Sequence, residues 1–224
     1  QVDWNVLRSS GALVRYVMKD RVIYLATIAI SVFWTVGAIL FIQFPPLAKN
    51  VIHASKEVAT LFIVMFSVGI AIGSVLINKL LKGEVSARYG SVSVIAMGFF
   101  IAVFYVFVRQ WPIGYPGQLL SVPEFLSYPL AWALLGVLLC IAICGGVFVV
   151  PLYAFLTTRV AGDKASRTIA ATNVISSVFM VGGAVLACFA VLEADPAYGP
   201  GGEKEIGGLF FSLVLTAFLS YGVA

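Results

Sequence analysis

The chain has 224 residues, of which 61% are hydrophobic and 11% are charged, and its mean hydropathy is +1.05. This composition excludes an ordinary soluble domain and a disordered chain, both of which carry many more charged residues. The formal net charge of +4 does not indicate nucleic-acid binding, because the basic residues are scattered among short gaps between apolar stretches, as is typical of membrane topology.

Residues 1–19 form a short basic segment that precedes the first apolar stretch. Apolar residues recur there at helical spacing, while Arg8, Arg15 and Lys19 take the other side. The pattern predicts a helix or linker on the membrane surface, with a solvated linker as the alternative. The chain begins with Gln1 and its last apolar run stops at Ala224, so we expect a segment of a longer protein.

Six uncharged stretches follow, and each is near or above the roughly 20 residues that a helix needs to cross the bilayer. They are residues 22–44, 58–78, 89–108, 125–158, 168–192 and 206–224. Backbone groups in lipid must find partners within their own segment, so such stretches are helical. The sequence therefore predicts an all-α transmembrane fold, a six-helix bundle over residues 20–224.

Two features refine these boundaries. Pro45 and Pro46 are expected to end the first span, because neither residue has an amide hydrogen to donate. The fourth stretch, residues 125–158, is too long for one straight span and predicts an interfacial piece followed by a long helix, kinked at Pro151. Residues 20–110 and 125–224 would then form two three-span halves of an inverted repeat.

Orientation follows from the Lys and Arg residues in alternate gaps. The N-terminal segment and the gaps after the second and fourth stretches hold ten of them, and the other gaps hold four. The richer side is expected to be cytoplasmic, so both termini of the chain are predicted to lie in the cytoplasm.

No catalytic or metal-binding pattern is present in the sequence. Cys140 and Cys144 lie one helical turn apart, but no histidine, cysteine or acidic residue nearby completes a zinc site. His53, the one histidine, falls in a gap between spans and is expected to be a surface residue. With no nucleophile beside a base and no phosphate-binding loop, we expect no enzyme, no metal and no cofactor.

Three predicted spans have a face of small and hydroxylated residues at helical spacing. These faces contain Thr27, Ser31 and Thr35 in the first span, Thr60, Ser67, Ser74 and Asn78 in the second, and Thr168, Thr172, Asn173, Ser176 and Ser177 in the fifth. Such a face lines a cavity or packs against another helix, and packing is the commoner role of Ser and Thr. For Asn173 both roles stay open, because an amide within the membrane has to face a partner helix or water.

Ionisable residues are absent from the middle of every predicted span. Ion-coupled transporters usually hold one there, so a coupling group would have to lie elsewhere in a longer protein. An apolar lining favours a substrate with a hydrocarbon tail. Gly69 and Gly73 form a small-xxx-small pair, which predicts close packing of two helices.

Short motifs in these spans resemble the major facilitator superfamily. Residues 74–79 (SVLINK) are similar to a degenerate form of its signature G-x-L-x-D-R, with Ser74, Asn78 and Lys79 in place of Gly, Asp and Arg. Residues 43–45, 66–74, 145–154 and 167–173 resemble bacterial lysophospholipid transporters, including those fused to acyltransferase and acyl-ACP synthetase domains.

The resemblance implies one half of a major facilitator, spans 7 to 12, built from two inverted three-helix repeats and completed by an N-terminal six-helix bundle. It implies that lysophospholipid, such as lysophosphatidylethanolamine, crosses the bacterial inner membrane by alternating access, and that a fused or partner acyltransferase follows. In that fold the first, second, fourth and fifth spans face the cavity. The implied cavity residues are Trp34, Gln43, Tyr153, Thr172, Asn173 and Ser176, the implied packing or gating residues are Gly69, Gly73, Gly146 and Pro151, and the loop signature retains Asn78 and Lys79.

Three alternatives remain. One is a drug or small-metabolite exporter of the same fold. Another is a membrane anchor that delivers lipid to an acyltransferase without transporting it. The third is a stand-alone six-span packing module, which the missing Met and the abrupt end of the chain disfavour.

Overall fold

The computed structural model describes residues 11, 14–15, 17–81, 89–112, 119–160 and 163–193. The elements in these ranges, in chain order, are α2 (Arg21–Pro46), the π-helical turn η1 (Leu47–Val51), α3 (Lys56–Leu81), α4 (Gly90–Arg109), α5 (Val122–Leu126), α6 (Pro129–Arg159) and α7 (Asp163–Glu193). Five of these helices are long and apolar enough to cross a membrane. The first five predicted spans are thus confirmed as helices, whereas the predicted sixth span, 206–224, lies outside the described residues.

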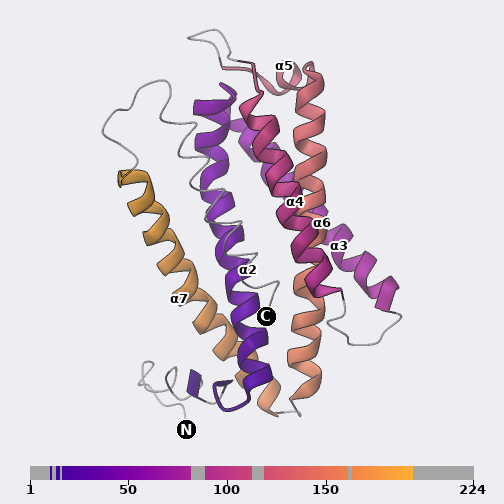
Figure 1. The fold of residues 1–224 in the computed structure, drawn as a ribbon, viewed down its shortest axis with the longest axis vertical. Helices are drawn as coiled ribbons and strands as arrows, with labels where there is room; N and C mark the ends of the chain where they lie inside the picture. The colour runs from indigo at the N-terminus through magenta and orange to yellow at the C-terminus, as the bar shows by residue number, and fades with distance from the viewer. Residues whose placement is uncertain are drawn as a thin grey trace.

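The long helices alternate in direction, and Figure 1 shows them as a bundle. We call the end where Arg21, Lys79 and Arg167 lie the basic end. The opposite end, which carries η1 and α5, is the capped end. The long fourth stretch divides as expected into the short helix α5 and the span α6, with a break at Ser127 and Tyr128.

The helix pair α3 and α6 runs parallel and in close contact. A Cβ atom built on Gly69 would lie 2.5 Å from Cβ of Ala142, and the Cα atom of Gly146 lies 3.1 Å from a Cβ built on Gly73. Both pairs are separated by the same number of residues, so the two helices advance in the same direction. The absence of side chains at these glycines lets the two backbones approach.

A second parallel pair consists of α2 and α7. Thr27 contacts Thr172 and Ser31 contacts Ser176, each across 145 residues of sequence. Helix α2 also packs against α6, where the ring of Phe33 lies 6.2 Å from that of Phe148. The two parallel pairs are therefore joined through the contact of α2 with α6.

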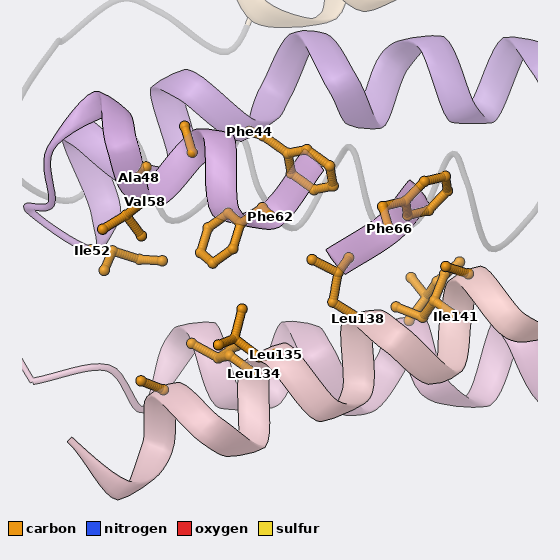
Figure 2. Close-up of a cluster of buried hydrophobic side chains, with 14 of the residues drawn as sticks. Phe44, Ala48, Ile52, Val58, Phe62, Phe66, Leu134, Leu135, Leu138 and Ile141 are labelled. Atoms are coloured by element: carbon orange, nitrogen blue, oxygen red, sulfur yellow. The ribbon is translucent and has the colours of Figure 1, made fainter. Parts of the chain in front are cut away.

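Two clusters of buried apolar side chains stabilise the bundle. The larger one joins the capped end to α3, α4 and α6, and Figure 2 shows Phe44, Phe62 and Phe66 facing leucines of α6 across it. The smaller cluster joins α2, α6 and α7 near the basic end. Val17, from the segment predicted to lie on the membrane surface, is fully buried in this smaller cluster, so part of that segment docks against the helices.

The α-helix of the first span ends at Pro46, as Pro45 and Pro46 were expected to cause, but the helical backbone does not stop there. Both prolines lie inside α2, and the chain then continues into η1. Proline fits a helical backbone, since Pro46 has φ −64° and ψ −37°, and the next amide, of Leu47, still bonds the carbonyls of Gln43 and Phe44. The coil then widens, because Ile52 donates its amide hydrogen to the carbonyl of Leu47 at 3.0 Å. The α-helix therefore ends at the two residues that lack donors, and the chain continues as one wider, π-helical turn.

The segments at the capped end are tied together by backbone hydrogen bonds. Ser55 donates its amide hydrogen to the carbonyl of Leu120 at 2.9 Å, and Leu120 donates to the carbonyl of His53 at 2.8 Å. Trp111, which is 5% exposed, adds a bond from its indole nitrogen to the carbonyl of Ile52 at 3.1 Å. Residues that are distant in sequence thus close this end of the bundle.

His53 lies at the centre of this closure in a left-handed backbone conformation, with φ +57°. A β-branched side chain is poorly tolerated there, whereas asparagine visits this region readily. We expect His53→Val to lower stability by about 1–2 kcal/mol, the usual cost of a left-handed residue, and His53→Asn to change it little. Thermal unfolding of the purified variants in detergent checks this, and equal midpoints would contradict it.

Helix α5 begins with a capping box at Ser121. Both the amide and the hydroxyl of Ser121 donate to Oε2 of Glu124 at 2.7 Å, and these bonds hold the pKa of the Glu124 carboxyl below its ordinary value. A lowered pKa means that the cap contributes fully above the unfolded-state pKa of Glu, ~4.3, and that its contribution is lost as pH falls through the folded-state value. We expect acid to lower the unfolding midpoint of the wild type more than that of Glu124→Gln. An identical acid response of the two proteins would contradict this.

Candidate functional site

Two of the predicted cavity residues, Trp34 of α2 and Tyr153 of α6, contact each other directly. The indole nitrogen of Trp34 donates a hydrogen bond to the hydroxyl oxygen of Tyr153 at 2.9 Å. Trp34 is 39% exposed and Tyr153 is half-buried, so the pair is open on one side. The neighbouring Phe33 holds the indole edge-on at 5.6 Å and also packs against α6. The pair therefore lies at a packed contact between two spans.

Thr172 and Ser176 lie in the contact between α2 and α7, where both are buried. The hydroxyl oxygens of Thr172 and Thr27 are 3.2 Å apart, and those of Ser176 and Ser31 are 3.0 Å apart. The Thr172 hydroxyl also donates to the carbonyl of Thr168 at 2.9 Å, so its single proton is used there and Thr27 must donate to it. By the same reasoning Ser176 donates to Ser31, whose proton goes to the carbonyl of Thr27. These hydroxyls satisfy one another within the helix contact.

A double-mutant cycle tests this hydroxyl pairing. Thr27→Val and Thr172→Val preserve the shape of each side chain and remove its hydroxyl. We expect a coupling energy of about 0.6 kcal/mol, because interhelical hydrogen bonds in membranes are weak on average. Unfolding in detergent measures it. A coupling energy of zero would show that the two hydroxyls act independently, and exposed Ser177→Ala serves as the control.

Gln43 and Asn173 are not brought to this pair. Gln43 is half-buried and follows Trp34 by nine residues on one continuous helix, which at about 100° per residue places it on the opposite face of α2. Asn173 is exposed and lies about 100° around α7 from Thr172, which faces α2. The six predicted cavity residues therefore separate into the Trp34–Tyr153 pair, the α2–α7 hydroxyls and two isolated amides.

The glycines predicted to aid packing lie where α3 meets α6. A Cβ on Gly73 would overlap the carbonyl oxygen of Ile143, and one on Gly146 would lie 2.5 Å from the carbonyl oxygen of Ile70. Pro151 is buried inside α6, two residues before Tyr153. Asn78 and Lys79, from the signature-like motif, are exposed near the basic end of α3, and residues 82–88, which follow, lie outside the described residues.

Sequence reasoning missed the partners of two further glycines, Gly145 of α6 and Gly183 of α7. A Cβ on Gly145 would lie 2.9 Å from the ring of Phe33, and one on Gly183 would overlap the Thr35 side chain. A glycine inside each apolar span was visible in the sequence, but the sequence does not show which helix packs against it. Sequence reasoning also missed Trp111, whose stacking on Phe125 at 5.3 Å closes the capped end.

The described residues show no gathering of three His, Cys, Asp or Glu side chains that would hold a metal ion. Cys140 and Cys144 are both half-buried on α6 with free thiols. Comparison with protein-family models, curated proteins and solved structures found no match to this chain. Its function therefore has to be inferred from its residues and their geometry.

Proposed function

We propose that the chain is one six-helix half of a transporter that moves a single-chain phospholipid, such as lysophosphatidylethanolamine, across the bacterial inner membrane by alternating access. The observation that carries the proposal is a mostly apolar helical wall in which an exposed polar contact, the Trp34–Tyr153 pair, joins α2 to α6. Charged residues of the described spans lie only in their first or last two turns. Such a wall suits a substrate whose hydrocarbon tail needs no polar partner.

The pairing of the helices supports an inverted repeat of three plus three spans. If the first span corresponds to the fourth and the second to the fifth, then the pair of α3 with α6 corresponds to the pair of α7 with α2. Both pairs are parallel and both use small residues at the contact. Inverted repeats of this kind occur in many secondary transporters.

The distribution of basic residues supports a cytoplasmic location for the basic end. Arg15, Lys19, Arg21, Lys79 and Arg167 are exposed in the segments at this end. Short loops on the cytoplasmic side are enriched in Lys and Arg. A lysophospholipid delivered there would be available to a cytoplasmic acyltransferase, fused to the chain or separate from it.

The test is uptake of labelled lysophosphatidylethanolamine by bacterial spheroplasts that lack their own carrier and express the natural full-length protein. We expect uptake above that of the empty-vector control, with no competition from soluble metabolites. Competition by amphipathic drugs or metabolites would favour an exporter of the same fold. No uptake by a well-expressed protein would overturn the substrate, and uptake only in the presence of an active acyltransferase would favour the anchor alternative.

A further inference from the structure

The hydrogen bond between Trp34 and Tyr153 leaves one proton unused. An indole nitrogen can only donate, so the Tyr153 oxygen must be the acceptor of the 2.9 Å bond. The hydroxyl hydrogen of Tyr153 has no acceptor among the described residues. A donor without an acceptor is costly in an apolar environment, which favours a ligand or water as its partner.

Trp34 lies in the middle of α2, whereas Tyr153 lies six residues before the end of α6 at Arg159, about 9 Å along the helix axis. Trp34 follows Arg21 by 13 residues and precedes Pro46 by 12, so at ~1.5 Å per residue it is about 18–20 Å from either end of α2. Tryptophan and tyrosine that anchor a protein to headgroups lie at the ends of spans. A headgroup-anchoring role therefore does not account for Trp34.

The helical period places Trp34 between two neighbouring helices. Ser31 faces α7 and Phe33 faces α6. At about 100° per residue, Trp34 lies in the angle between these two directions, on the side where α6 and α7 flank α2. Trp34 is 39% exposed, so the described parts of α6 and α7 do not cover it completely.

We propose that the Tyr153 hydroxyl, held in place by the Trp34 indole, donates a hydrogen bond to a phosphodiester oxygen of a single-chain phospholipid. The inference rests on the proposed function and assigns the headgroup contact within it. A charged acceptor suits this donor, because hydrogen bonds to ionised groups are roughly twice as strong as neutral ones. Mid-span Lys and Arg are absent from the described helices, so a neutral donor is what they offer to the phosphate.

The experiment compares ligands that differ in their acceptor. Full-length protein in lipid nanodiscs binds labelled ether-linked lysophosphatidylethanolamine, which has a phosphodiester and no ester carbonyl. Ester-linked lysophosphatidylethanolamine and hexadecyltrimethylammonium, which has no acceptor, are measured as competitors. We expect Tyr153→Phe to weaken binding of both phospholipids about tenfold and to leave hexadecyltrimethylammonium unchanged. Trp34→Phe, which keeps the hydroxyl but removes its holder, should give a smaller loss of the phospholipids alone.

Tyr24→Phe is the matched control, because Tyr24 is a half-buried tyrosine on the same helix, α2. It should bind all three ligands as the wild type does. Unchanged phospholipid affinity in Tyr153→Phe, or an equal loss for all three ligands, would overturn the assignment while the proposed function stands. A loss confined to the ester-linked lipid would replace the phosphodiester by the carbonyl and so overturn it too. Failure of the wild type to bind either phospholipid would instead overturn the proposed function, and the inference with it.

Discussion

Gly73→Ala is expected to destabilise the bundle by about 1–3 kcal/mol, the usual cost of forcing an extra carbon into a packed contact. The added Cβ would overlap the carbonyl oxygen of Ile143 and lie 3.1 Å from Cα of Gly146. Both obstacles are backbone atoms of α6, so no side-chain rotation relieves them and the two helices have to separate. The loss should appear as a lower midpoint of thermal unfolding in detergent.

Gly136→Ala on α6 is the matched control, because a Cβ there meets no atom within 4 Å. Alanine favours a helix over glycine by up to ~1 kcal/mol, so this variant should be as stable as the wild type or more stable. If Gly73→Ala were as stable as Gly136→Ala, then α3 and α6 would not be in the close parallel contact described above.

Trp111→Ala is expected to cost about 3–5 kcal/mol, the range for truncating a large buried aromatic side chain. Trp111 is 5% exposed, stacks on Phe125 at 5.3 Å and 27°, and bonds the carbonyl of Ile52. The ring of Phe125 in turn lies 5.9 Å from that of Phe62 on α3. Removing the indole therefore opens the capped end and leaves a buried carbonyl without its partner.

Trp132→Ala supplies the comparison. Trp132 is 63% exposed and its indole bonds the carbonyl of Leu126 at 3.0 Å, so it has a similar hydrogen bond but little burial. We expect a loss below about 1.5 kcal/mol, the net value of one hydrogen bond. The same unfolding assay measures both variants. Equal losses would mean that the closure of the capped end does not depend on the burial of Trp111.

Sequence periodicity and hydropathy sufficed to place the spans. The third stretch, predicted at residues 89–108, is α4 (Gly90–Arg109), and the fourth stretch contains the expected long helix, which begins at Pro129 after the short helix α5. These features depend on local composition and on where proline interrupts the chain. The continuation of the chain beyond Pro46 as the π-helical turn η1 was not predictable in the same way, because it depends on whether this part of the chain can find other hydrogen bonds at the capped end.

The candidate site was predicted only in part, because helix faces are chosen by their neighbours. Both sides of α7 carry polar residues, so periodicity alone could not tell that Thr172 faces α2 while Asn173 is exposed. Trp34 and Tyr153 were each implied as cavity residues by resemblance. Their contact joins positions 119 residues apart, which no local pattern encodes.

The central proposal is movement of a lysophospholipid between leaflets, and a reconstituted system measures it most directly. Purified full-length protein in liposomes would be loaded with labelled lysophosphatidylethanolamine in the outer leaflet, and albumin would extract the label that remains there. We predict that the fraction protected from albumin grows faster than in protein-free liposomes and that heat-inactivated protein abolishes the difference. Equal protection with and without active protein would contradict transport and leave only a helical membrane bundle.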